Sequence, residues 1–361
     1  LGKSYILAGK FEQAEKHLLL AIRGFDSLLN SKNLKRPQKI AAKKQKARLL
    51  TQRAYLDTQR GYYNQADSIL KTHQLTVRKL TSVVDIAYIE HLIAFARNRE
   101  AQERYRTANQ YYRKGQRANE YYDFAFKKSS KSYFLMQESI VKNHIYNEAA
   151  LPLEYSFAML KLKKDTKHFF PKNSSYFARI KLLEAERAMK RRSYQKAQKI
   201  LLEILDPKSP IYLPADHELR AIATKYLAKT YEKDVFTKIE EVEKTYQDWL
   251  AIQQSRYPTD GFTYQVSNLE LADFYLRETE NFQVGKAIFE SNPLEQIAKN
   301  ISQISPSYIR IANWFANYYE NIDQYDKAMS LVQKNVQFAE KNYGSSDIRF
   351  AKQLAILASV Q

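Results

Sequence analysis

The chain has 361 residues, of which 58 are Lys or Arg and 39 are Asp or Glu, so its formal net charge is +19. Apolar residues make up 44% of the sequence, which is enough for a hydrophobic core and excludes a wholly disordered chain. The absence of Cys excludes disulfides, thiolate metal sites and a Cys nucleophile, and no apolar run approaches the ~18 residues of a membrane-spanning helix.

The N-terminal segment has a spacing of large and small residues that is typical of a helical hairpin. Gly9 is followed by Phe11, Ala14 and Leu18. A small residue such as Ala14 lets two antiparallel helices approach closely, while Phe11 and Leu18 fill the space between neighbouring hairpins. Gly9 is expected at the turn, where the missing Cβ tolerates a chain reversal.

The same motif, a large residue followed by a small one at the third and a large one at the seventh position, recurs along the chain. Further copies begin at Tyr63, Tyr105, Tyr146, Tyr194, Ile239, Phe282 and Tyr325. The Ile239 copy carries Val242 in place of the small residue. The small-residue positions are 14, 66, 108, 149, 197, 242, 285 and 328, which indicates a repeat of about 42 residues.

This motif resembles the tetratricopeptide repeat (TPR), a helix–turn–helix unit, in a long variant similar to the kinesin-light-chain type. The segment from Tyr343 to Asp347 resembles the link between repeats of that variant. The resemblance implies an all-α fold, a right-handed α-solenoid of antiparallel helix pairs known as a TPR superhelix. No segment alternates polar and apolar residues for long enough to predict a strand.

We expect residues 1–361 to form a single solenoid of about eight units and a final helix, 346–361. The approximate units are 1–45, 46–88, 89–128, 129–175, 176–219, 220–262, 263–306 and 307–345. Helical periodicity is clearest over Leu49–Tyr62, Tyr176–Met189 and Ile309–Tyr319, and Ser307 and Ser346 or Asp347 are expected N-caps. Because Leu1 falls inside a repeat helix, we expect the chain to be part of a longer protein.

Charge is distributed unevenly. Residues 1–199 hold 41 Lys or Arg and 17 Asp or Glu, a net of +24, while residues 200–361 hold 17 and 22, a net of −5. The densest basic stretch contains Lys32, Lys35, Arg36, Lys39, Lys43, Lys44, Lys46, Arg48 and Arg53. Such a basic patch is typical either of a surface for a polyanion, such as nucleic acid, anionic lipid or an acidic partner, or of a merely solvated flank.

TPR proteins hold partner peptides on a concave face built from the first helices of successive units. At the corresponding places the resemblance puts Arg97, Glu138, Arg179, Glu186, Lys190, Asp273, Arg277, Arg310, Asn313, Asn317 and Asn321. The three Asn residues lie along one helix face, where carboxamides could bind an extended peptide backbone. For any single one of these residues, simple hydration is the favoured interpretation.

No catalytic motif, metal-ligand spacing or cofactor motif is present, so we expect no enzyme activity, metal or cofactor. The predicted function is a protein–protein interaction scaffold that holds a partner protein segment on its concave face. Two alternatives remain. One is a recognition arm of a larger protein that resembles CHAT peptidases or sensor kinases, and the other is polyanion binding by the basic N-terminal half. The localisation is open, with a bacterial envelope slightly favoured over the cytoplasm.

Overall fold

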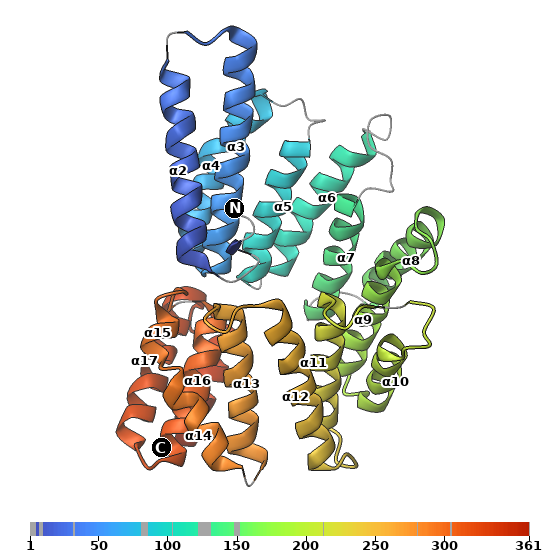
Figure 1. Cartoon of the computed structure of the whole chain (residues 1–361), viewed down its shortest axis with the longest axis vertical. Helices are drawn as coiled ribbons and strands as arrows, with labels where there is room; N and C mark the ends of the chain where they lie inside the picture. Colours follow the sequence, from blue (N-terminus) through green and yellow to red (C-terminus); the bar gives the residue numbers. More distant parts are fainter. Residues whose placement is uncertain are drawn as a thin grey trace. The chain divides into compact units, whose positions relative to one another are not determined.

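The computed structural model describes all residues except 1–4, 7–9, 32, 81–85, 103, 122–130, 148–151, 212, 280, 304 and 361. Throughout the described residues the regular structure is α-helical and contains no strand (Figure 1). By its internal contacts the chain divides into two compact units. Unit 1 comprises Leu1–Ala14, Gln59–Tyr62 and Gln253–Gln361, and unit 2 comprises Glu15–Thr58 and Tyr63–Ile252.

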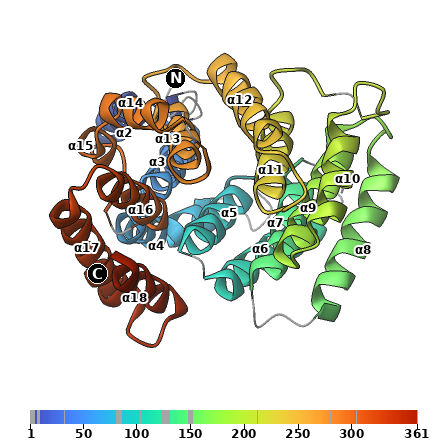
Figure 2. The same ribbon diagram turned by 90° about the horizontal axis from the view of Figure 1, so that it is seen from below.

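Unit 2 is built mainly from successive helices joined by short connections. These helices are α2 (Phe11–Asn30), α3 (Arg36–Gln59), α4 (Tyr63–Leu80), α5 (Ile86–Ala101), α6 (Tyr105–Tyr121), α7 (Lys131–Tyr146), α8 (Pro152–Phe169), α9 (Ser175–Lys190), α10 (Tyr194–Leu205), α11 (Glu218–Glu232) and α12 (Ile239–Arg256). From α4 to α11, each helix contacts the next, and α9 also contacts both α7 and α11. Helices α8 and α10 lie on the same side of α7 and α9 (Figure 2).

The contact pattern is complete for α7 and α9, each of which contacts its own second helix, α8 or α10, and the next first helix. By the alternation of helices along the chain, α5 and α11 are also first helices and α6 and α12 second helices, and Tyr246 of α12 donates a hydrogen bond to Glu232 of α11 at 2.6 Å. In a TPR-like array of helical hairpins, each first helix contacts both its own second helix and the first helix of the next hairpin, as seen here for α7 and α9. The predicted all-α fold of repeated helix pairs is confirmed.

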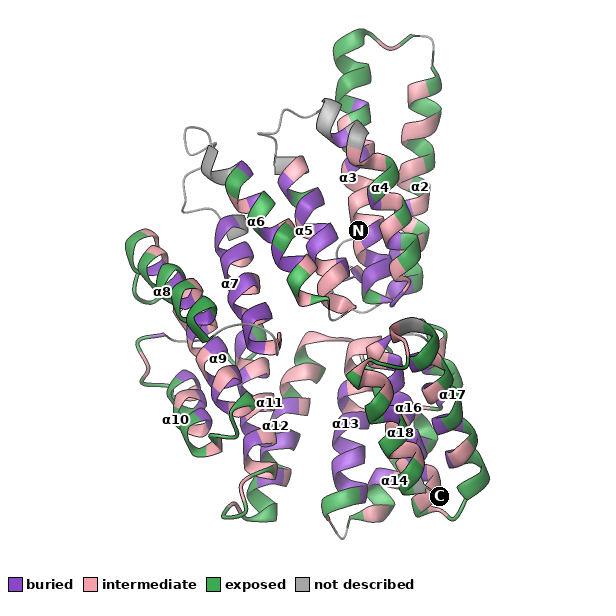
Figure 3. Cartoon of the chain, turned by 180° about the vertical axis from the view of Figure 1, so that it is seen from behind, coloured by how far each residue is buried: buried purple, intermediate pink, exposed green. Residues whose placement is uncertain are grey.

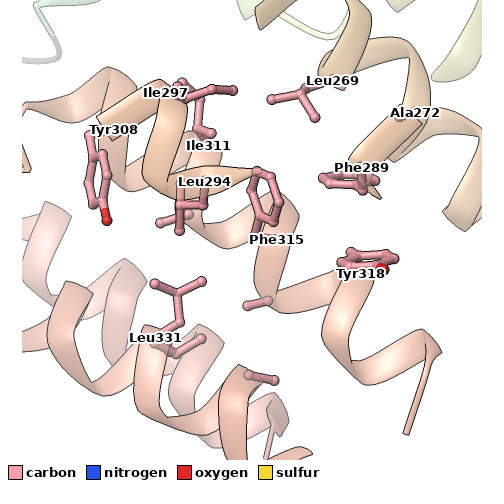
Figure 4. Close-up of a cluster of buried hydrophobic side chains, with 14 of the residues drawn as sticks. Leu269, Ala272, Phe289, Leu294, Ile297, Tyr308, Ile311, Phe315, Tyr318 and Leu331 are labelled. Atoms are coloured by element: carbon pink, nitrogen blue, oxygen red, sulfur yellow. The ribbon is translucent and has the colours of Figure 1, made fainter. Parts of the chain in front are cut away.

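Unit 1 continues the same hairpin pattern. It contains α13 (Phe262–Glu278), α14 (Phe282–Ser291), the short α15 (Leu294–Ala298), α16 (Pro306–Asn321), α17 (Tyr325–Tyr343) and α18 (Ile348–Val360). First helices α13 and α16 contact each other and their own second helices, α14 and α17. Its core surrounds Phe289, whose ring stacks on Tyr318 at 5.0 Å and meets Phe315 edge-on at 4.9 Å (Figure 4).

The repeat motif marks where most second helices begin. Second helices begin at the first motif residue in seven copies, namely Phe11, Tyr63, Tyr105, Tyr194, Ile239, Phe282 and Tyr325. The small residues are buried at the helix contacts, as Ala197 and Ala328 are completely. At Gly285 an added Cβ would lie 2.9 Å from the carbonyl oxygen of Ala272 on the partner helix, so this contact requires Gly.

One copy of the motif was wrong. Tyr146 is the last residue of first helix α7, and Ala149 lies outside the described residues. The second helix, α8, begins instead at Pro152, because the fixed φ of proline suits the first turn of a helix and its missing N–H costs nothing there. Counted from Pro152, the buried Tyr155 and Met159 have the motif's spacing, but a bulky Tyr replaces the small residue.

Three smaller expectations are also settled by the helix ends. The N-cap of α16 is Ser305, whose hydroxyl accepts a hydrogen bond from the Tyr308 amide at 3.0 Å, and not Ser307, because Pro306 already occupies the first turn. Asp347 accepts from the Arg349 amide at 2.9 Å and so caps α18 as predicted. The expected boundary at 45/46 falls inside α3, which begins earlier, at Arg36.

Ala197→Leu and Ala328→Leu test this register. Both Ala side chains are fully buried in second helices, so four-carbon side chains would overpack the helix contacts. We expect each substitution to lower the free energy of unfolding by about 1–3 kcal/mol in thermal or urea melts followed by circular dichroism. Lys199→Leu on the exposed side of α10 is the matched control and should change stability by less than about 0.5 kcal/mol. Equal melts for Ala197→Leu and wild type would contradict the register.

Candidate partner-binding surfaces

The first helices of unit 2 carry charged side chains that meet across adjacent repeats. Arg179 on α9 donates from Nη1 to both carboxylate oxygens of Glu138 on α7, at 3.2 Å each. Burial raises the pKa of Glu138, and the neighbouring guanidinium opposes that rise. Two of the predicted site residues are therefore brought together, and they link neighbouring hairpins.

Glu186, a third predicted site residue, is buried two turns further along α9. Its Oε1 accepts a hydrogen bond from Tyr226 on α11 and lies 3.9 Å from the Lys142 ammonium on α7. Its Oε2 is also buried and has no hydrogen-bond partner among the described groups. Burial and the Glu186 charge raise the pKa of Tyr226 well above its ordinary value, so this hydroxyl stays a donor at neutral pH.

A third carboxylate of the same region was missed by the sequence analysis. Glu100 on α5 accepts a hydrogen bond from the Tyr112 hydroxyl on α6 at 2.7 Å. Burial raises the pKa of Glu100, while the bond from Tyr112 and the charges of Lys142 and Arg97 lower it. Because Lys142 and Glu186 act on both Glu100 and Glu138, the groups share one electrostatic environment. We call Glu100, Glu138, Lys142, Arg179 and Glu186 the central charge cluster.

The solvent-accessible edge of this face is cationic. The Lys142 side chain is 43% exposed although its ammonium approaches Glu186. Lys190 is exposed at the end of α9, with its ammonium 5.8 Å from the centre of the Tyr146 ring. Arg97 is half-buried and lies 5.2 Å from the centre of the Tyr55 ring. The carboxylates are thus engaged inside the protein, whereas the cations reach the surface.

In unit 1 the predicted residues of α13 and α16 also meet. Asp273 is buried and accepts from Arg277 Nε at 3.0 Å and from the Asn317 side-chain amide at 3.3 Å. Asp273 and Asn317 are 44 residues apart, close to the repeat length. As with Glu138 and Arg179, residues one repeat apart hydrogen-bond across adjacent first helices.

The remaining residues of the Asn stripe use part of their hydrogen-bonding capacity within unit 1. Asn313 accepts from the Asn335 amide of α17 at 2.8 Å, and Asn321 donates to the Asn317 carbonyl at 2.7 Å. Arg310 is exposed, with its guanidinium 5.4 Å from the centre of the Trp314 ring. The side-chain oxygen of Asn317 and the exposed Asn321 and Arg310 are the groups best placed for an external ligand.

Several members of the predicted basic patch are paired with acidic side chains. Acidic residues of other segments approach three of its members, through the pairs Lys46–Asp26, Arg48–Glu90 at 4.0 Å and Arg53–Glu15 at 2.6 Å. Lys32 lies outside the described residues, and Lys44 is half-buried with an interaction of its own. Lys35, Arg36, Lys39 and Lys43 are exposed at the start of α3. Because acidic side chains neutralise part of the patch, its net positive charge is lower than the composition of the stretch indicates.

Within the described ranges, no cluster of three or more His, Asp or Glu side chains could hold a metal ion. None of the helices that the structure describes is both long and apolar enough to cross a bilayer. The carboxylates of the first helices accept hydrogen bonds from tyrosines and cations.

Comparisons with known proteins found similarity only among solved structures. No protein-family model matches the chain, and neither does any curated protein. Among solved structures, the chain is similar to a crystal structure of nearly identical TPR-like repeats of a putative kinesin light chain from Podospora anserina. The two are 17% identical with a TM-score of 0.43, over 61% of this chain and 100% of that one. The TPR-like class rests on the helix pairs of the chain itself.

Proposed function

We propose that this chain is a non-enzymatic protein–protein interaction scaffold. Its first helices would hold an extended segment of a partner protein. The observation that carries the proposal is the row of polar groups on α5, α7, α9 and α11, in which buried carboxylates are bonded within the protein and cations reach the surface. TPR-like arrays generally act through such faces rather than through catalysis.

The charges of this face favour an acidic partner segment. Arg97, Lys142 and Lys190 come from three successive first helices, so a chain running across the hairpins would meet a cation at each one. The buried Glu186 carboxylate holds the Lys142 ammonium at this face, 3.9 Å from its Oε1. Pre-organised donors and acceptors of this kind lower the entropic cost of binding an extended peptide.

Site-specific photo-crosslinking in the source cells tests the proposal. A photoreactive amino acid is placed at Lys190 or Arg97 of the full chain, and at the exposed Lys196 on second helix α10 as the matched control. We expect one protein to be captured from both first-helix positions and not from position 196. Its cross-linked peptide should be rich in Asp and Glu, as read by mass spectrometry.

A charge change provides the second arm of this experiment. With the cross-linker at position 97, Lys190→Glu should reduce the yield of the adduct several-fold, because it places a carboxylate where the partner has one. Lys196→Glu should leave the yield unchanged. Equal capture at all three positions, or capture only at position 196, would contradict binding to the first helices.

Three further predictions stay open beside this proposal. They are a single continuous solenoid of eight units, a recognition arm of a larger protein similar to CHAT peptidases or sensor kinases, and polyanion binding. For the last, the exposed Lys35, Arg36, Lys39 and Lys43 would carry the contacts. Binding of duplex nucleic acid would then fall steeply with salt concentration, because counterions are released at each phosphate contact.

A further inference from the structure

Second helix α8 exposes an apolar stripe on its outer face. Leu153, Phe157 and Leu160 are 66%, 69% and 66% exposed, and their spacing of four and three residues places them on one side of the helix. The opposite side packs into unit 2 through Tyr155, Met159, Leu162 and Thr166. Figure 3 shows α8 with a largely exposed surface. Three adjacent large apolar side chains in solvent indicate a binding surface.

A groove runs beside this stripe, between α6, α7 and α8. Its volume is about 340 Å³, which is within the range of sites that accept a bulky side chain. It is lined by Arg113, Gln116, Gln137, Ile140, His144, Glu154, Phe157, Ala158 and Lys161. Ile140 and Ala158 form an apolar part of the lining, and Phe157 belongs both to the groove and to the stripe.

The same helix face becomes cationic towards its C-terminal end. Lys164 follows Leu160 by four residues and Lys167 by seven, so the stripe continues as exposed ammonium groups. Lys161 adds a cation at the groove itself. The acidic residue of this half-helix, Asp165, is engaged by Gln137, whose side-chain amide donates to it at 2.7 Å.

We infer that the α8 surface, defined as Leu153, Phe157, Leu160, Lys161, Lys164, Lys167 and the adjoining groove, docks an acidic amphipathic helix of a partner protein. The apolar face of that helix covers the stripe and inserts one large side chain into the groove beside Phe157, while its carboxylates meet the three Lys residues. The charge pattern sets the direction, since the acidic end must lie over the C-terminal half of α8.

A flat anionic bilayer fits this surface less well. It would contact the protruding stripe but leave the groove unfilled. It would also bring anionic headgroups close to the exposed Glu154 on the groove rim. The α8 surface is separate from the first-helix face, so a test of one does not decide the other.

Fluorescence anisotropy with the full chain tests the inference. The probe is a labelled synthetic helix of about 18 residues, with Leu and Phe on one face and Glu on both flanks. A scrambled peptide of the same composition and a peptide with Gln in place of Glu serve as comparisons. We expect the amphipathic acidic peptide to bind with a Kd at least about tenfold lower than either comparison.

Matched variants locate the binding. Phe157→Ser should raise the Kd about thirtyfold, as expected for the loss of a central aromatic anchor, and Lys164→Glu about tenfold. The controls are Phe236→Ser, which removes an 83% exposed ring elsewhere, and Lys172→Glu, which reverses an exposed charge. Both controls should stay within about twofold of wild type. Circular dichroism melts verify that each variant is folded.

Each other outcome overturns the inference. Equal binding of the scrambled peptide means that charge alone attracts the probe. Equal losses in the Phe157 and Phe236 variants mean that no specific site exists. Binding of phosphatidylserine vesicles through Phe157, with no binding of the peptide, assigns the α8 surface to a lipid bilayer instead of a protein.

Discussion

Phe289→Ala is expected to lower the free energy of unfolding of unit 1 by about 3–5 kcal/mol. The Phe289 side chain is 1% exposed on α14, and its ring lies between Tyr318 and Phe315 of α16 (Figure 4). Truncation removes both ring contacts and leaves a cavity that the α13, α14 and α16 backbones cannot close. Val284→Ala, at a 48% exposed position of the same helix, should cost less than about 1 kcal/mol.

The two Trp residues make this effect measurable unit by unit. Trp314 lies on α16 in unit 1, next to Phe315, and Trp249 lies on α12 in unit 2. Urea unfolding followed by fluorescence in a Trp249→Phe background reports unit 1 alone. The urea concentration at the midpoint of unfolding should fall strongly in the Phe289→Ala variant and little in the Val284→Ala variant. An unchanged midpoint would mean that α14 does not pack through this face.

In helical repeats, each hairpin contacts chiefly its neighbours, so a local loss of packing need not spread. A Trp314→Phe background reports unit 2 through Trp249. We expect Phe289→Ala to shift this second transition less than the first. Equal shifts at both Trp residues would show that the two units unfold as one cooperative body.

The sequence predicts the fold because the packing of helical hairpins is local and repetitive. Seven second helices begin at the first residue of a motif copy, because most units need a small side chain at the helix crossing and large ones on either side. The copy at Tyr146 failed for the same reason that motifs fail in general: the spacing of Tyr146, Ala149 and Leu153 matched by chance. Pro152, a residue that favours the first turn of a helix, was the better signal for the start of α8.

The candidate site was predictable only in part. The residue types on the first helices were found, but their partners were not, because a side chain's neighbour in the next repeat depends on how adjacent hairpins are aligned. A usable signal existed. Glu138 and Arg179, Glu186 and Tyr226, and Asp273 and Asn317 are separated by 41, 40 and 44 residues, each close to one repeat. Complementary residues one period apart are therefore candidates for such bonds.

Exposure was the least predictable property. The stripe of Leu153, Phe157 and Leu160 has the same periodicity as a buried helix face, so the sequence alone assigns it to the core. In the structure the opposite face of α8 is the one that packs. In the basic patch the sequence overestimates the net charge. The acidic residues that approach Lys46, Arg48 and Arg53 include residues of other helices, which a count over the local sequence leaves out.

Arg179→Met is expected to destabilise unit 2 by about 3 kcal/mol at pH 7. The substitution keeps much of the side-chain volume but leaves the half-buried Glu138 carboxylate without the guanidinium that donates to both of its oxygens. Adding Glu138→Gln should recover much of the loss, because a neutral amide needs no counter-charge. Lys163→Met, which breaks the more exposed pair with Glu184, should cost less than about 1 kcal/mol.

The loss should also depend on pH, in a direction that follows from the pKa of Glu138. Burial raises this pKa above 4.5 in the folded protein, so the folded state binds the proton more tightly than the unfolded state does. Stability from this group is fully present below pH 4.5 and is lost as the pH rises through the folded pKa. Without Arg179 the pKa of Glu138 in the folded protein is higher still, so ionisation of Glu138 at pH 7 lowers the stability of the variant more than that of wild type. The difference in unfolding free energy between wild type and variant should therefore shrink as the pH falls towards 4.5.

This difference is measured by urea unfolding at pH 7 and pH 5, followed through the fluorescence of Trp249 in a Trp314→Phe background. A difference that stays constant would show that Arg179 stabilises α7 and α9 by packing and not by charge.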